Sequence, residues 1–110
     1  MARCPIDLIH GTLDVLVLKT LSWQPAHGYA ISRAIEERTK GVFDLEDAAL
    51  YKALHRLEAS GALAAEWGAS ENNRRAKYYT LTAFGRKALR AETTTWHKYA
   101  TAVTSVLGAA

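Results

Sequence analysis

The chain has 110 residues, of which 49% are hydrophobic and 23% charged, and these proportions are typical of one folded domain rather than a disordered tail. Its 14 basic residues exceed its 11 acidic ones, giving a net charge of +3. This excess is small, so the positions of the cations indicate the kind of partner better than the net charge does. The single cysteine, Cys4, excludes an intramolecular disulfide and fits a reducing cytoplasm. The longest strongly apolar run, at residues 15–18, is far shorter than the ~20 residues that span a bilayer.

Two helices are predicted at the start of the chain from apolar residues at helical spacing. The first covers residues 8–23, with Asp7 as its N-cap. A turn over residues 24–28 follows. The second helix covers residues 29–40, and Gly41 ends it, since glycine commonly follows a helix C-terminus.

A third helix follows residues 42–45, which are interpreted as a short strand or as coil. Glu46 and Asp47 place acid at its start, where the helix dipole favours negative charge. The helix ends at Gly61. Its inward face comprises Leu50, Leu54 and Leu57.

After Gly61 the apolar period changes from about 3.6 to about 2. Residues 63–68 and 77–82 alternate in this way, and a polar stretch at residues 69–75 separates them. This pattern predicts a β-hairpin. A long helix then begins at Thr82 or Ala83 and runs to about Leu107 without a proline.

Three helices followed by a hairpin are the order of a winged helix-turn-helix. The expected fold class is therefore mainly α with a small β-hairpin. We expect a winged helix-turn-helix DNA-binding domain over residues 1–82 and a C-terminal dimerisation helix over residues 83–110. In that arrangement the third helix can enter a major groove while the hairpin tip reaches phosphate.

Basic residues gather in and after the hairpin. Residues 72–90 contain six cations and no acid. A cationic hairpin tip can bind a polyanion and release its counterions, although an isolated Arg pair is more often a solvated turn. The position after a helix-turn-helix pattern favours nucleic acid. The candidate contacts here are Asn73, Arg74, Arg75 and Lys77.

The outward face of the third helix carries Lys52, His55 and Arg56, with Tyr51 at the edge between its two faces. These side chains can meet base edges or phosphates. The alternative is an ordinary amphipathic surface with Tyr51 in the core.

The last helix repeats mainly apolar residues at the spacing of a heptad seam. At roughly 25 residues it is about 37 Å long, so we expect a homodimer, although the stripe can also pack on the first helix of its own chain. Trp96 and Tyr99 could line a cavity for an aromatic effector, or simply pack in the interface. The expected interface residues are Leu89, Trp96, Tyr99, Val103 and Val106.

No catalytic or metal-binding motif is found. No pair among the four histidines has HExxH spacing, and no glycine-rich phosphate loop occurs. Cys4 has no neighbour that would activate its thiol. We therefore expect no enzyme activity, no metal, no cofactor and no membrane association.

The sequence resembles the PadR family of bacterial transcriptional regulators, in its short type with a single C-terminal helix. The matching segments are GTLDVLVLKTLSWQPAHGYAISRAIE (residues 11–36), LYKALHRLEASGAL (residues 50–63) and EWGASENNRRAKYYTLTAFGRKAL (residues 66–89).

The resemblance implies a dimeric repressor that binds a palindromic operator and is released by a small aromatic or lipophilic effector. It assigns Tyr29 to a phosphate contact at the start of the second helix. The residues that correspond to the recognition helix and wing are Tyr51, His55, Arg56, Arg74, Arg75 and Lys77.

Two positions of the third helix depart from many relatives, which have Ser in place of Ala49 and Pro in place of Lys52. Together with Glu46 and Asp47, Ala49 supports an alternative function, a winged-helix protein-interaction module that does not bind DNA.

Overall fold

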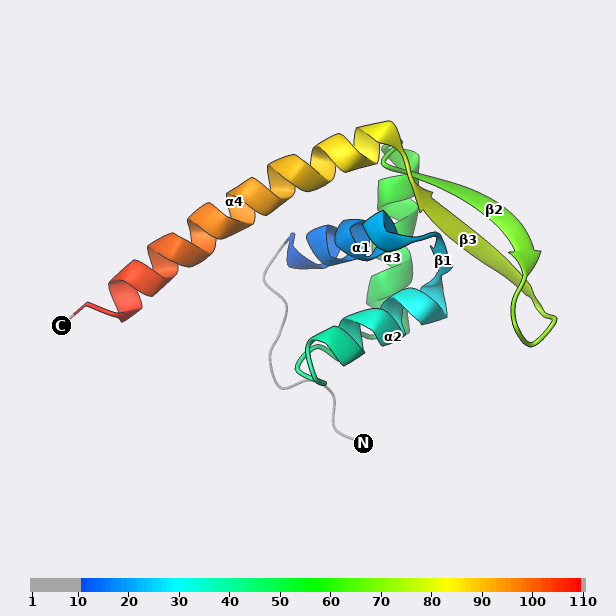
Figure 1. Ribbon diagram of the computed structural model, residues 1–110, viewed down its shortest axis with the longest axis horizontal. Coiled ribbons are helices and arrows are strands. Elements are labelled where there is room, and N and C mark those ends of the chain that lie inside the picture. The colour runs from blue at the N-terminus through cyan, green and yellow to red at the C-terminus, as the bar shows by residue number, and fades with distance from the viewer. Residues whose placement is uncertain (1–10, 110) are drawn as a thin grey trace.

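The computed structural model describes residues 11–109, which form four helices and a three-stranded antiparallel sheet (Figure 1). Cys4 and the predicted cap Asp7 lie outside the described residues. In chain order the elements are α1 (Thr12–Trp23), β1 (Ala26–His27), α2 (Gly28–Arg38), α3 (Asp47–Ala59), β2 (Leu63–Ala69), β3 (Arg75–Leu81) and α4 (Ala83–Leu107).

The first helix starts later than predicted. Gly11 has a φ of 87°, in the left-handed region that glycine tolerates and a right-handed helix cannot contain. The prediction of one helix through residue 11 is therefore wrong, and α1 begins at Thr12.

The sheet contains one strand more than the predicted hairpin. Ala26 pairs with Tyr79 and His27 with Tyr78, so the segment interpreted as a turn supplies a third strand, and the strand order is β1-β3-β2. Two residues are too few to show an alternating pattern, which explains the error. The hairpin itself is confirmed, with Leu63 opposite Leu81 at its base.

The core lies between the first three helices and one face of the sheet. The predicted inward face of α3 is buried, with Leu54 fully enclosed. Tyr79 is the largest of the fully buried side chains and brings the central strand β3 into the same cluster. The remaining surface of α3 is thereby turned outward beside the hairpin.

The start of α4 is fixed to the rest of the chain by Thr82 and Gly85. The Thr82 hydroxyl accepts a hydrogen bond from the backbone N–H of Gly85 at 2.9 Å and donates to the carbonyl of Gly61 at 2.7 Å. Gly85 itself is buried, and a Cβ there would lie 2.1 Å from the carbonyl oxygen of Ala62. Only glycine allows this close approach of helix and backbone.

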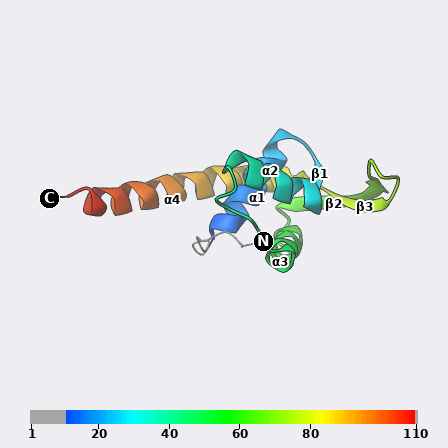
Figure 2. The same ribbon diagram turned by 90° about the horizontal axis from the view of Figure 1, so that it is seen from below.

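Beyond this base, α4 projects away from the other helices on the side opposite the hairpin (Figures 1 and 2). Leu89 still packs partly against the core, but later apolar residues are exposed. These are Trp96, Tyr99, Val103, Val106 and Leu107. Among residues 11–109, no helix is both long and apolar enough to cross a membrane.

Replacing Gly85 with alanine is expected to lower the free energy of unfolding by about 1–3 kcal/mol, because the new methyl group overlaps a backbone carbonyl that cannot turn aside. Urea denaturation measures the loss. Gly68→Ala is the control, since its Cβ would make an ordinary contact with Tyr78 at 3.5 Å. Equal midpoints for Gly85→Ala and the wild type would contradict the close docking of α4.

Candidate nucleic-acid interface

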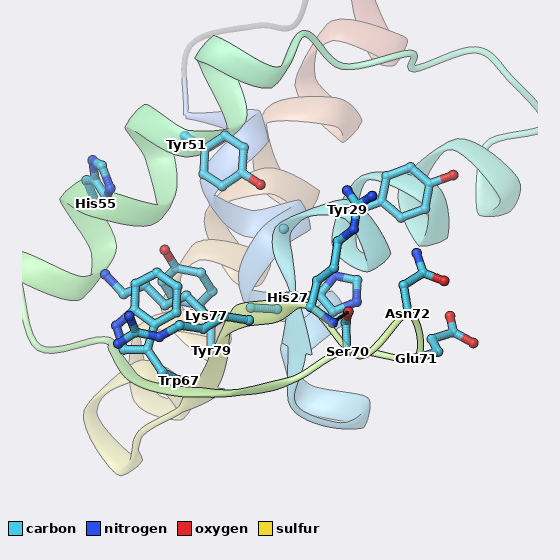
Figure 3. A pocket seen from close by; sticks show the side chains of 14 residues that line it. His27, Tyr29, Tyr51, His55, Trp67, Ser70, Glu71, Asn72, Lys77 and Tyr79 are labelled. Atoms are coloured by element: carbon cyan, nitrogen blue, oxygen red, sulfur yellow. Dashed lines mark hydrogen bonds between the residues drawn. The ribbon is translucent and has the colours of Figure 1, made fainter.

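A groove of about 700 Å³ separates α3 and the N-terminus of α2 from the wing, a name used here for β2, β3 and residues 70–74 between them (Figure 3). It brings together residues from three distant parts of the sequence. The predicted DNA contacts that line it are Tyr29, Tyr51, His55, Arg74, Arg75 and Lys77. The other three, Lys52, Arg56 and Asn73, do not line this groove.

Tyr51 and His55 face the groove from successive turns of α3 (Figure 3). Tyr51 is partly exposed, so its edge position on the helix is as predicted. Its ring lies against Gly28, where a Cβ would come within 2.6 Å of the phenol oxygen. The glycine before Tyr29 therefore lets α3 sit directly against the start of α2.

The N-terminus of α2 is organised by His27, a residue that no motif or spacing in the sequence marks as functional. Its Nδ1 accepts a hydrogen bond from the backbone N–H of Ala30 at 3.2 Å, and its ring meets Tyr78 edge-on at 5.3 Å between centroids. The histidine thus caps the helix and joins it to the sheet.

Tyr29 projects from the first turn of α2 and is largely exposed. Arg33 donates to its phenol oxygen at 3.1 Å and pairs with Glu37 at 3.1 Å. These contacts raise the pKa of Arg33, the hydrogen bond to Tyr29 most. A cation one turn into α2 is therefore held beside the predicted phosphate contact.

The wing tip is a tight turn that exposes its cations. The Asn73 backbone donates to the carbonyl of Ser70 at 2.8 Å, and Asn73 adopts a φ of 60°, which asparagine tolerates better than most residues. Arg74 and Arg75 follow and are exposed. Arg75 lies over the indole of Trp67 at 4.4 Å.

Two of the predicted contacts have carboxylate partners within the chain. Lys77 donates to Glu58 of α3 at 3.0 Å, and Arg56 pairs with Asp14 of α1. The hydrogen bond to Glu58 is the main reason that the pKa of Lys77 is raised above its usual value. Lys77 is therefore charged throughout the neutral range, and the stability that its raised pKa adds is lost only as the pH rises past the ordinary pKa of lysine.

Replacing Glu58 with glutamine is expected to tighten duplex binding, because Lys77 becomes free to contact a phosphate. The slope of log affinity against log salt concentration should steepen by about 0.9 for each Lys77 that does so. Affinity measured across a salt series tests this. The control is Glu92→Gln, which removes the same charge from α4, away from the groove. Identical slopes for Glu58→Gln and the wild type would contradict the idea that Glu58 and DNA phosphate compete for Lys77.

The charge of the groove suits a polyanion. Three cations line it, Arg74, Arg75 and Lys77, and Glu71 is the one acid among the described residues that line it, while Glu58 pairs with Lys77 from outside the lining. A helix face and a cationic wing that border one groove can contact base edges and phosphates together.

A second groove, of about 720 Å³, lies between α1 and α4. Its walls are mostly apolar and include Leu16, Phe43, Leu89 and Trp96. Trp96 stacks on Tyr99 at 5.7 Å between ring centroids. Of the two aromatic residues of the predicted seam, Trp96 therefore lines this groove within a single chain and Tyr99 does not.

The three-helix core, the helix with an outward polar face and the adjoining wing define the class of winged helix-turn-helix DNA-binding proteins. Residues 17–91 match the transcriptional regulator PadR-like family. The chain belongs to this family. This match confirms the resemblance that the sequence predicts. Because the family consists of transcription regulators, it also confirms the expectation that the protein is not an enzyme.

Individual relatives and solved structures are similar to the chain over most of its length. The chain is 34% identical over 83 residues to "Uncharacterized protein X" of Lysinibacillus sphaericus, covering 76% of each chain. The crystal structure of a PadR family transcriptional regulator from Eggerthella lenta is 35% identical, with a TM-score of 0.75 over 88% of this chain and 82% of that one. A transcriptional regulator from Clostridium thermocellum is 27% identical, with a TM-score of 0.79 over 86% and 89% of the two chains.

Proposed function

We propose that this regulator is a cytoplasmic repressor that binds a palindromic operator as a homodimer and is released by a small aromatic or lipophilic effector. The observation that carries the proposal is the groove in which the outward face of α3 and the cations of the wing adjoin. Base contacts from α3 supply sequence preference, and phosphate contacts from the wing supply most of the affinity.

The exposed part of α4 supports the homodimer. Trp96, Tyr99, Val103 and Val106 remain exposed, and burying such a stripe in a second copy is favourable. Leu89 contributes less, because it packs partly on its own core. In this proposal residues 1–82 bind DNA and residues 83–110 dimerise, and a two-fold dimer presents two α3 helices to two half-sites.

The groove between α1 and α4 supports an aromatic or lipophilic effector. Trp96 offers a flat apolar ring in the same groove as Val15 and Leu16 of α1, and such walls suit an aromatic ligand. The alternative role of Trp96 and Tyr99 is packing in the dimer interface alone. Titration with a panel of aromatic compounds, followed by their effect on duplex binding, separates the two roles.

Selection of bound duplexes from a random pool tests the proposed function. We expect an inverted repeat to be enriched, and we expect the complex to weaken steeply with salt. Failure to retain any duplex at low ionic strength would contradict DNA binding and favour the protein-interaction module.

Replacing His55 with alanine is expected to change the preference among operators by about 1–3 kcal/mol at one position of each half-site. His55 is exposed on α3 and lines the groove, so its loss should affect base readout more than phosphate binding. Repeating the selection with the variant measures the change. An unaltered operator motif would assign recognition to other residues.

A further inference from the structure

Trp67 is a large aromatic side chain that lies exposed on the wing and that the proposed function leaves without a role. Trp67 is 55% exposed, and it lines the groove between α3 and the wing. Exposed tryptophan on a short two-stranded ribbon gains little from core burial. Its ring instead contacts a cation of the neighbouring strand β3.

The strand register places two cations on the same face as Trp67. Lys77 is its direct cross-strand partner, and Arg75, two residues earlier on β3, projects to the same face because strand side chains alternate. Lys77 turns away toward Glu58. The ring face of Trp67 is consequently occupied by Arg75, whose guanidinium lies 4.4 Å from the ring centroid.

We propose that Trp67 is a positioning residue that holds Arg75 ready to bind a phosphate of duplex DNA. This inference rests on the DNA binding proposed above and adds a residue to it. Stacking on the indole occupies one face of the guanidinium and leaves its N–H edge free to donate to phosphate oxygens. It also restricts the rotamers of Arg75 before DNA arrives, which reduces the entropy lost on binding.

Arg74 provides an internal comparison for this role. It adjoins Arg75 in sequence, carries the same charge and lines the same groove, but the aromatic stack of the wing involves Arg75. Removal of the indole should therefore weaken the contribution of Arg75 and leave that of Arg74 intact.

A second tryptophan–arginine stack provides a matched control. Arg38 lies over Trp23 at the same distance of 4.4 Å, and neither residue lines the groove between α3 and the wing. Trp23→Ala thus removes an equivalent stack from a surface that the proposal does not use.

The experiment compares Trp67→Ala in three backgrounds, using the full-length protein and the duplex enriched by selection. In the wild type and in Arg74→Ala, affinity is expected to fall roughly 3–10-fold, as for loss of a partly desolvated cation–π contact. In Arg75→Ala, Trp67→Ala is expected to have no further effect. Trp67→Phe should retain most of the affinity, and Trp23→Ala should retain all of it.

The proposal is overturned if Trp67→Ala leaves duplex affinity unchanged, or if the loss is as large in Arg75→Ala as in the wild type. It is also overturned if Trp67→Phe, which keeps an aromatic face, binds as weakly as Trp67→Ala. A wild-type protein that retains no duplex would instead contradict the proposed function, so the two failures are distinguishable.

Discussion

The double variant Arg74→Ala/Arg75→Ala is expected to bind every duplex roughly 100-fold more weakly at ~0.1 M salt and to lose about 3–4 units of its log–log salt slope. Each arginine that meets a phosphate contributes about 0.9 to that slope, and a dimer carries two wings. Both side chains are exposed at the wing tip. Because phosphate contacts carry little sequence information, the loss should be similar for operator and unrelated duplexes.

The matched control for this variant is Arg86→Ala/Lys87→Ala. It removes the same charge from two exposed residues of α4 that do not line the groove. If the two double variants weakened binding equally, net charge would explain the effect and the wing would have no special part in it. Fluorescence anisotropy across a salt series gives both the affinity and the slope.

Trp96→Asp is expected to convert the proposed homodimer to a monomer. Trp96 is 36% exposed within a single chain, and it stacks on Tyr99 in the middle of the apolar stripe of α4. A carboxylate buried at this position in an interface would have to lose its hydration without a compensating partner, which costs several kcal/mol for each protomer. Sedimentation measures the mass directly.

Trp23→Asp is the control for the change in assembly. It introduces the same charge at a tryptophan that is also exposed but lies at the end of α1, outside the α4 stripe. This variant should keep the dimer mass. An unchanged dimer for Trp96→Asp would rule out the proposed seam, and a monomeric wild-type protein would rule out the homodimer altogether.

The elements with long, regular apolar patterns could be predicted from the sequence. The heptad-like leucines of α3 and the alternating residues of β2 and β3 occupy the faces expected of them. The shortest element, β1, could not be predicted, because Ala26 and His27 form a strand only through pairing with β3. The start of α1 depended on the backbone conformation of Gly11, which composition and spacing do not reveal.

The candidate site was predictable only in part, for a similar reason. Charge and spacing identified Lys77 and Arg56 as cations of the wing and of α3, but their partners lie 19 and 42 residues away in the sequence. Contacts over such separations depend on tertiary packing. The alternation of residues 63–68 placed Trp67 on a strand but gave no sign of Arg75 above its ring.

The close contact at Gly85 joins α4 to the winged helix-turn-helix, so that the helix acts as a lever arm on it. Its base is fixed beside Ala62, in the segment 60–62 between α3 and β2, so a tilt of α4 and a rotation of the winged helix-turn-helix are one movement. Over a length of about 37 Å, a change of about 5° in the angle between two crossed levers displaces a tip by about 3 Å. In the proposed homodimer, the crossing angle of the two α4 helices would set the spacing between the two DNA half-sites that the α3 helices can contact.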